Sequence, residues 1–149
     1  MPDSTHDTEQ HIRKVQARMQ VVLHELTIRA AHHDESKLYE PEKSGYDKLT
    51  ADLKDIVYGS DAYRAALAEA KPVIDHHYAH NSHHPEHYPN GIAGMSLLDI
   101  VEMVCDWKAA SERAKQGSIA QSLTHNKQRF GIDDQLAAIL ENTVRELGW

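Results

Sequence analysis

Residues 96–115 read SLLDIVEMVCDWKAASERAK, and this stretch decides the class of fold. Ser96 is a typical helix N-cap residue, and Asp99 three positions later completes a variant of the capping box. Gly117 supplies a stop signal just beyond the stretch. The sequence therefore predicts a strong helix from Ser96 to about Lys115.

The acidic side chains of this predicted helix share one face. Asp99, Glu102 and Asp106 recur at i, i+3 and i+7, away from the apolar residues of the same stretch. Such acidic stripes are usually solvated helix faces. Ala109 and Ala110 continue the stripe with small side chains, which would let another helix or a ligand approach.

The rest of the chain is also helical in pattern. Apolar residues at spacings of three and four run through residues 8–31, and further helices are expected at 46–57, from residue 60 or 61 onward, at 118–129 and at 133–147. Pro72 predicts a kink or restart in the third of these helices, whereas the segment from Asn81 to Gly94 has the composition of a loop. No stretch alternates as a strand does. We expect an all-α, single-domain bundle of about six or seven helices over residues 1–149, with residues 1–8 flexible.

The composition limits the classes of function. The chain has 149 residues, a formal net charge of −7 and one cysteine, Cys105. The negative charge argues against non-specific binding to nucleic acid, and no apolar run approaches the ~18 residues that cross a bilayer. A single cysteine cannot form an internal disulfide, which is compatible with a reducing cytoplasm. We expect a cytoplasmic protein that acts on a small molecule, binds no membrane and can pair as a homodimer.

Histidines gather in one short stretch. Residues 74–88 read IDHHYAHNSHHPEHY, and they hold six of the twelve histidines of the chain. Neutral imidazole is the commonest protein ligand for first-row transition metals, so the cluster predicts a metal or phosphate site. The alternative is a solvated histidine-rich loop that acts as a pH-sensitive interface.

A second chemical motif lies upstream, where residues 32–37 read HHDESK. His33 and Asp34 form an adjacent imidazole–carboxylate pair at the end of the first predicted helix. Taken alone, the pair also fits a helix C-terminus that carries a favourable histidine cation beside a surface carboxylate.

In this order the motifs resemble the HD-domain superfamily of metal-dependent phosphohydrolases. Members of the superfamily have an early histidine, a His-Asp dyad, further histidines and a late aspartate on another helix. The strings H-x3-V, H-D-x-S-K and H-Y-x2-N-x-H-H-P-E are most similar to a small uncharacterised family of phage and bacterial HD-like proteins, over residues 11–113. The resemblance implies an HD-like helical bundle with one or two divalent ions of manganese, iron, cobalt, nickel or zinc. The metal ligands that it implies are His11, His33, Asp34, His77, His83, His84 and Asp106.

The chemistry of these ligand types explains the expected activity. A carboxylate with two or three imidazoles binds such an ion and leaves positions for water and a phosphate oxygen. We therefore expect a metal-bound hydroxide to hydrolyse a nucleotide or another small phosphate ester. Lys37 would neutralise phosphate charge, and Glu35 or Glu86 would serve as the acid–base group or orient a ligand histidine.

His11 poses a geometric problem for this assignment. In one straight helix, His11 and His33 would be separated by roughly 33 Å. The two can share a metal only if the chain turns between them, and the sequence offers no good turn signal there. If the helix is unbroken, a histidine of the cluster must replace His11.

Two other functions use the same residues. Some HD-type proteins are similar in pattern but hold two irons and activate O₂, and histidine-rich sites suit iron. The second alternative is a catalytically lapsed protein whose site makes partner binding responsive to metal or pH.

Overall fold

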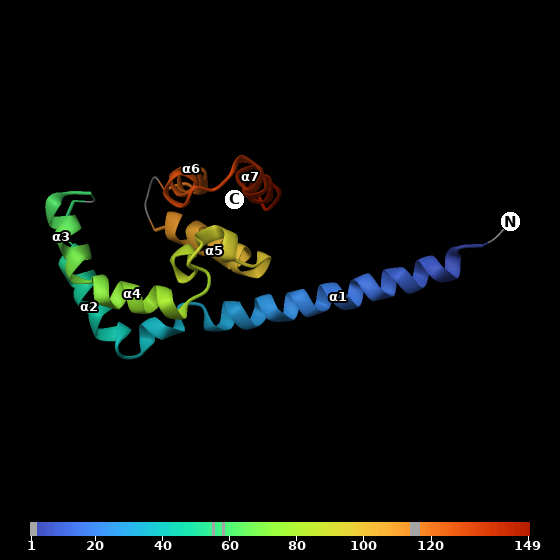
Figure 1. The fold of residues 1–149 in the computed structure, drawn as a ribbon, viewed down its shortest axis with the longest axis horizontal. Coiled ribbons are helices and arrows are strands. Elements are labelled where there is room, and N and C mark those ends of the chain that lie inside the picture. The colour runs from blue at the N-terminus through green and yellow to red at the C-terminus, as the bar shows by residue number, and fades with distance from the viewer. Residues whose placement is uncertain (1–2, 55, 58, 114–116) are drawn as a thin grey trace. The chain divides into compact units, whose positions relative to one another are not determined.

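The computed structural model describes residues 3–54, 56–57, 59–113 and 117–149 of the chain. Within these ranges it contains seven α-helices, three short 3-10 helices and no strand (Figure 1). The expected all-α class is confirmed. The chain divides into two compact units, Met1–His33 and Asp34–Trp149. That the two units form one domain stays a prediction.

The first unit is built on a single long helix. Helix α1 (Thr5–His32) runs for 28 residues without a break, and the expected flexible segment is already helical from Thr5. None of its residues is buried. Since no turn interrupts it, His11 and His33 are roughly 33 Å apart along the helix and cannot bind the same ion. The assignment of His11 and His33 to one metal is therefore wrong.

Three α-helices and a 3-10 turn open the second unit. They are η1 (Glu35–Leu38), α2 (Glu42–Leu53), α3 (Asp61–Glu69) and α4 (Lys71–His80), and α2 contacts each of the other three. The expected break at Pro72 is confirmed, because α4 starts afresh with this proline in its first turn. Ser60 caps α3 by accepting a hydrogen bond from the backbone amide of Tyr63.

The second predicted helix is misplaced by about one turn. We expected residues 46–57, whereas α2 spans Glu42–Leu53. Pro41 stands at its N-terminus, and Gly45 lies within it instead of before it. A Cβ at Gly45 would overlap the side chain of Val73 on α4, so this glycine permits close packing of the two helices.

The loop from residue 81 to 94 leads into the last three helices. It contains η2 (Pro85–His87) and η3 (Gly91–Gly94) and is followed by α5 (Leu97–Ser111), α6 (Ile119–Phe130) and α7 (Asp134–Glu146). The capping box of Ser96 and Asp99 is present as predicted. Helix α5 ends at Ser111, and the predicted end at Lys115 lies outside the described residues.

The hydrophobic core of the second unit joins α5, α6 and α7. Met103 and Val104 of α5 pack with Leu123 of α6 and with Leu140 and Val144 of α7. Helix α5 is thus fixed on one side by the core, which leaves its acidic face free to meet the histidine loop. No helix among the described residues is both long and apolar enough to cross a membrane.

Candidate metal centre

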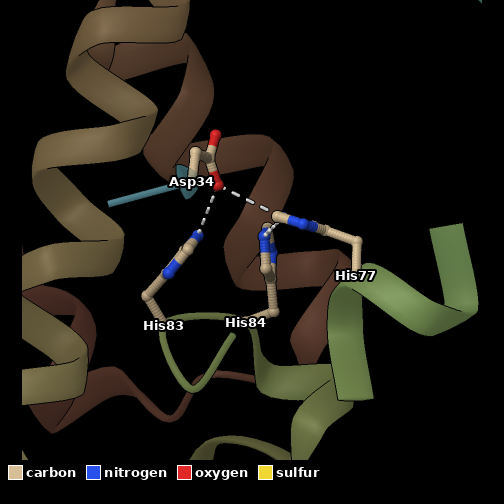
Figure 2. A group of neighbouring side chains, drawn as sticks. All are labelled: Asp34, His77, His83 and His84. Carbon is tan, nitrogen blue, oxygen red and sulfur yellow. Dashed lines mark hydrogen bonds and ion pairs between the residues drawn. The ribbon is translucent and has the colours of Figure 1, made fainter. Parts of the chain in front are cut away.

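Four side chains from three parts of the second unit converge on one point (Figure 2). Asp34 lies at the start of η1, His77 on α4, and His83 and His84 in the loop that follows α4. Each offers one ligand atom, and these four atoms all lie within 4.8 Å of one another. The sequence assigned all four of these residues to a metal site.

The spacing of these atoms fits an ion. Nε2 of His77 is 3.2 Å from Oδ1 of Asp34 and 3.0 Å from Nε2 of His84. Nε2 of His83 is 3.5 Å from the same oxygen of Asp34. Ligand atoms held ~2.1 Å from one ion in tetrahedral or octahedral geometry lie roughly 3.0–3.4 Å apart. Small movements would therefore suffice to coordinate a transition metal.

Carboxylates of Glu42, which is buried, and Glu102, which is partly buried, contact the far side of two of the imidazoles. Nδ1 of His77 donates to Oε2 of Glu42 at 2.8 Å, and Nδ1 of His83 lies 3.2 Å from Oε1 of Glu102. Such partners set the tautomer of a ligand histidine and hold its ring in place, as in carboxylate–histidine–metal arrangements. Both rings then present Nε2 toward the carboxylate of Asp34, so that these nitrogens and the carboxylate oxygen face a common point.

Glu42 is the most completely buried charged group of this network. It is 0% exposed, and its two oxygens accept hydrogen bonds from Nδ1 of His76, Nδ1 of His77 and Oγ of Ser36. Burial alone would raise the pKa of Glu42, but these hydrogen bonds outweigh it and hold the pKa below its ordinary value. Glu42 is therefore a carboxylate at neutral pH.

Asp34 occupies a strained backbone position. Its φ of 57° is the only positive value at a non-glycine residue in the described part of the chain. The left-handed region costs a residue with a Cβ on the order of 1 kcal/mol, and such strain gathers at functional sites. Lys37 contributes to holding Asp34 there, with Nζ 2.6 Å from Oδ2.

The charge states suit metal binding. Burial raises the pKa of Asp34, but hydrogen bonds from His77, His83 and Lys37 more than compensate and lower it. Burial, together with the neighbouring rings of His83 and His77, lowers the pKa of His84 to about 3. At neutral pH the centre thus offers an ionised carboxylate and, at His84, a neutral imidazole.

The acidic stripe of α5 meets the histidine loop. Asp99 is buried and accepts hydrogen bonds from Ser82 and Tyr88, which fixes the start and the middle of the loop to α5. One helical turn further along α5, Oε1 of Glu102 lies 3.2 Å from Nδ1 of His83. A carboxylate oxygen of Asp106 lies within 4.8 Å of a ring nitrogen of His83. The stripe is therefore not a purely solvated face, because two of its carboxylates contact the loop.

A family model described as "Family of unknown function (DUF5662)" matches residues 2–146. The chain belongs to this family. No curated protein and no solved structure matches the chain. The match covers both units and all four converging residues of this DUF5662 protein.

The remaining predicted site residues differ in their distance from the centre. Lys37 lies beside Asp34 and packs over the ring of Tyr46, with Nζ 5.1 Å from the ring centre. Glu35 begins η1 and is partly buried. Glu86 is bound to Arg129 of α6 at 2.7 Å, an ion pair that accounts for its position without any role at the centre. His33 ends the first unit, and its role as a ligand stays a prediction.

Sequence reasoning missed two members of the network. Glu42 lies before the predicted helix at 46–57 and was therefore not considered, although the first turn of a helix is a favourable position for a glutamate. Glu102 was noticed only as part of the acidic stripe. Its spacing of one helical turn from Asp106 was the signal that could have assigned it to the histidine loop.

Proposed function

We propose that this protein is a metal-dependent phosphohydrolase that acts on a nucleotide or another small phosphate ester. The observation that carries the proposal is the convergence of one carboxylate and three imidazoles within 4.8 Å, with the ammonium group of Lys37 beside it. The resemblance of the motifs to the HD superfamily supports the same class of reaction. The cytoplasm is the proposed location of the protein, since the free thiol of Cys105 is compatible with a reducing compartment.

The ligand set suits hydrolysis because it is incomplete for a six-coordinate ion. Asp34, His77, His83 and His84 would hold the ion, with positions left for water and a phosphate oxygen. A divalent transition metal bound there would supply Lewis acidity, which lowers the pKa of water towards ~7 and polarises a phosphoryl group.

The surrounding residues would orient the ligand imidazoles and supply charge for the substrate. Glu42 and Glu102 hold the imidazoles of His77 and His83 in place. Lys37 is partly exposed at the edge of the centre, with 32% of its side chain accessible, and would meet an incoming phosphate. Asp106 would accept the proton that the attacking water releases, because its carboxylate lies within 4.8 Å of a ring nitrogen of His83.

Phosphate release tests this function directly. The tag-free protein, loaded in turn with manganese, iron, cobalt, nickel or zinc, is incubated with a panel of nucleotides and a chromogenic phosphodiester. We expect turnover with at least one metal, and its loss in Asp34→Asn, which removes the charge yet tolerates the left-handed backbone. His125→Gln, a change at an exposed histidine of α6, should leave turnover intact. Bound metal with no turnover on any substrate would contradict the proposal.

A di-iron oxygenase is the second candidate. It is favoured by the imidazole-rich ligand set and by Asp106, which would add a second carboxylate near His83. Iron content near two equivalents together with oxygen consumption would support it over hydrolysis. Metal-dependent self-association without either reaction would instead support a catalytically lapsed protein.

A further inference from the structure

Helix α1 presents an apolar face that the metal chemistry does not use. Ile12, Val15, Met19 and Val22 are between 42% and 60% exposed, and none of the 28 residues of the helix is buried. An exposed apolar stripe of this length on one helix is typical of a surface that another helix covers.

The stripe has the spacing of a coiled-coil seam. Ile12, Val15, Met19, Val22 and Leu26 recur at alternating intervals of three and four residues. With Ile12 at position a of a heptad, the five residues fill successive a and d positions. Arg18 and Glu25 then both fall at position g, on the edge of the seam.

We propose that α1 pairs with α1 of a second copy of this chain as an antiparallel two-helix coiled coil. In this register Met19 lies opposite Val22 of the second copy, and Val15 lies opposite Leu26 of the second copy. Antiparallel pairing sets position g against position g, so Arg18 faces Glu25 of the second copy. The twofold symmetry of the pair repeats this ion pair once, between Glu25 of the first copy and Arg18 of the second copy.

The charges select this orientation. In a parallel pair, position g faces position e of the next heptad, which would set Arg18 against Leu23 of the second copy and Glu25 against Ala30 of the second copy. The antiparallel pair therefore gains two ion pairs that the parallel pair lacks. This interface does not depend on the proposed hydrolase activity.

Sedimentation of the full chain tests the proposal. We expect the wild type to sediment as a dimer at micromolar concentration and Val22→Glu, which puts a charge in the seam, to sediment as a monomer. His24→Glu places the same charge on the opposite side of α1 and should remain dimeric. Far-UV circular dichroism will show whether the second unit is intact in each variant. A monomeric wild type, or a Val22→Glu chain that stays dimeric, would overturn the proposal.

Charge reversal tests the pairing of the two edges. Arg18→Glu alone and Glu25→Arg alone should each raise the dimer dissociation constant several-fold, because each creates two like-charge contacts. The double variant Arg18→Glu/Glu25→Arg should restore the wild-type constant. Failure of the double variant to recover would overturn the antiparallel register.

A distance between two labels tests the orientation. Gln10→Cys in a Cys105→Ser background carries one spin label per chain. The antiparallel register separates the two labels by roughly 30 Å along the seam, from the 1.5 Å rise per residue. A parallel pair would place the two labels at the same height along the seam, separated only by the width of two packed helices, roughly 20 Å, and would overturn the proposal.

Discussion

The carboxylate of Glu42 lies 2.8 Å from Nδ1 of His77, whereas Nε2 of the same ring lies 3.2 Å from Asp34. One imidazole thus joins a fully buried anion to the candidate metal centre. If the centre binds a metal, the buried carboxylate orients the ligand and should affect metal affinity without touching the metal.

Glu42→Gln should weaken metal binding by about 10–100-fold, the usual effect of removing a carboxylate behind a ligand histidine. Glutamine keeps the shape of the side chain but loses the negative charge that His77 and His76 contact. Competition with a chromophoric chelator measures the affinity. The matched control is Glu40→Gln, an exposed glutamate two residues earlier, which should bind metal as the wild type does. Equal metal affinities for both variants would show that Glu42 has no part in metal binding.

Asp99→Ala should cost about 2–4 kcal/mol of the free energy of unfolding, because several hydrogen bonds to a buried charge are lost together. Asp99 accepts from Ser82, Tyr88 and Ser96, so both the loop and the start of α5 lose an anchor. Urea denaturation measures the change. Asp47→Ala removes an exposed aspartate of α2 and should change stability by no more than ~0.5 kcal/mol. A cost for Asp99→Ala as small as that of the control would mean that the loop is held in another way.

Lys37→Met should lower kcat/KM for a phosphate ester by about 10–100-fold while the metal content stays near that of the wild type. The reason is that Lys37 contacts the outer oxygen of Asp34 and would neutralise the substrate, yet it is not a ligand itself. Lys43→Met on α2 is the control, because Lys43 is exposed and pairs with Asp47. Metal lost in parallel with activity would show that Lys37 stabilises the site and not the substrate.

The metal-free chain should lose stability through His84 as the pH falls below 6.5. The unfolded ring takes up a proton near its ordinary pKa of 6.5, whereas the folded ring has a pKa of about 3. Between these values the unfolded state binds more protons, so acidification lowers the free energy of unfolding. The rings of His83 and His77 oppose protonation, and the carboxylates of Asp106 and Asp34 favour it less strongly.

Urea denaturation of chelator-treated protein at pH 7 and pH 5 measures this effect. The drop in the free energy of unfolding should be smaller in His84→Gln than in the wild type. His125→Gln should keep the wild-type drop, because His125 is exposed on α6. Equal drops in all three proteins would show that His84 is not held neutral.

The helices were predictable where local signals agree. The capping box of Ser96 and Asp99 fixed the start of α5, and Pro72 marked the start of α4. The predicted helix at 46–57 began after Gly45, whose role is tertiary: it admits Val73 of α4, which no local pattern reveals. The placement of α2 was wrong for this reason.

The ligand types of the candidate centre could be predicted from the sequence, but the carboxylates that orient the histidines could not. The density of histidines pointed to the stretch 74–88, and the resemblance of the motifs implied His77, His83, His84 and Asp34 as ligands. The roles of Glu42 and Glu102 depend on which face of α2 and α5 meets the histidine loop, and a single sequence does not give that packing. His11 was excluded only when α1 proved to be unbroken.

The metal content of protein purified without a histidine tag tests the central claim most directly. The account predicts about one to two equivalents of a transition metal per folded chain, lost in His83→Ala and Asp34→Asn and kept in His125→Ala. A folded wild type that carries no metal, and that takes up none when titrated with manganese, iron, cobalt, nickel or zinc, would contradict it.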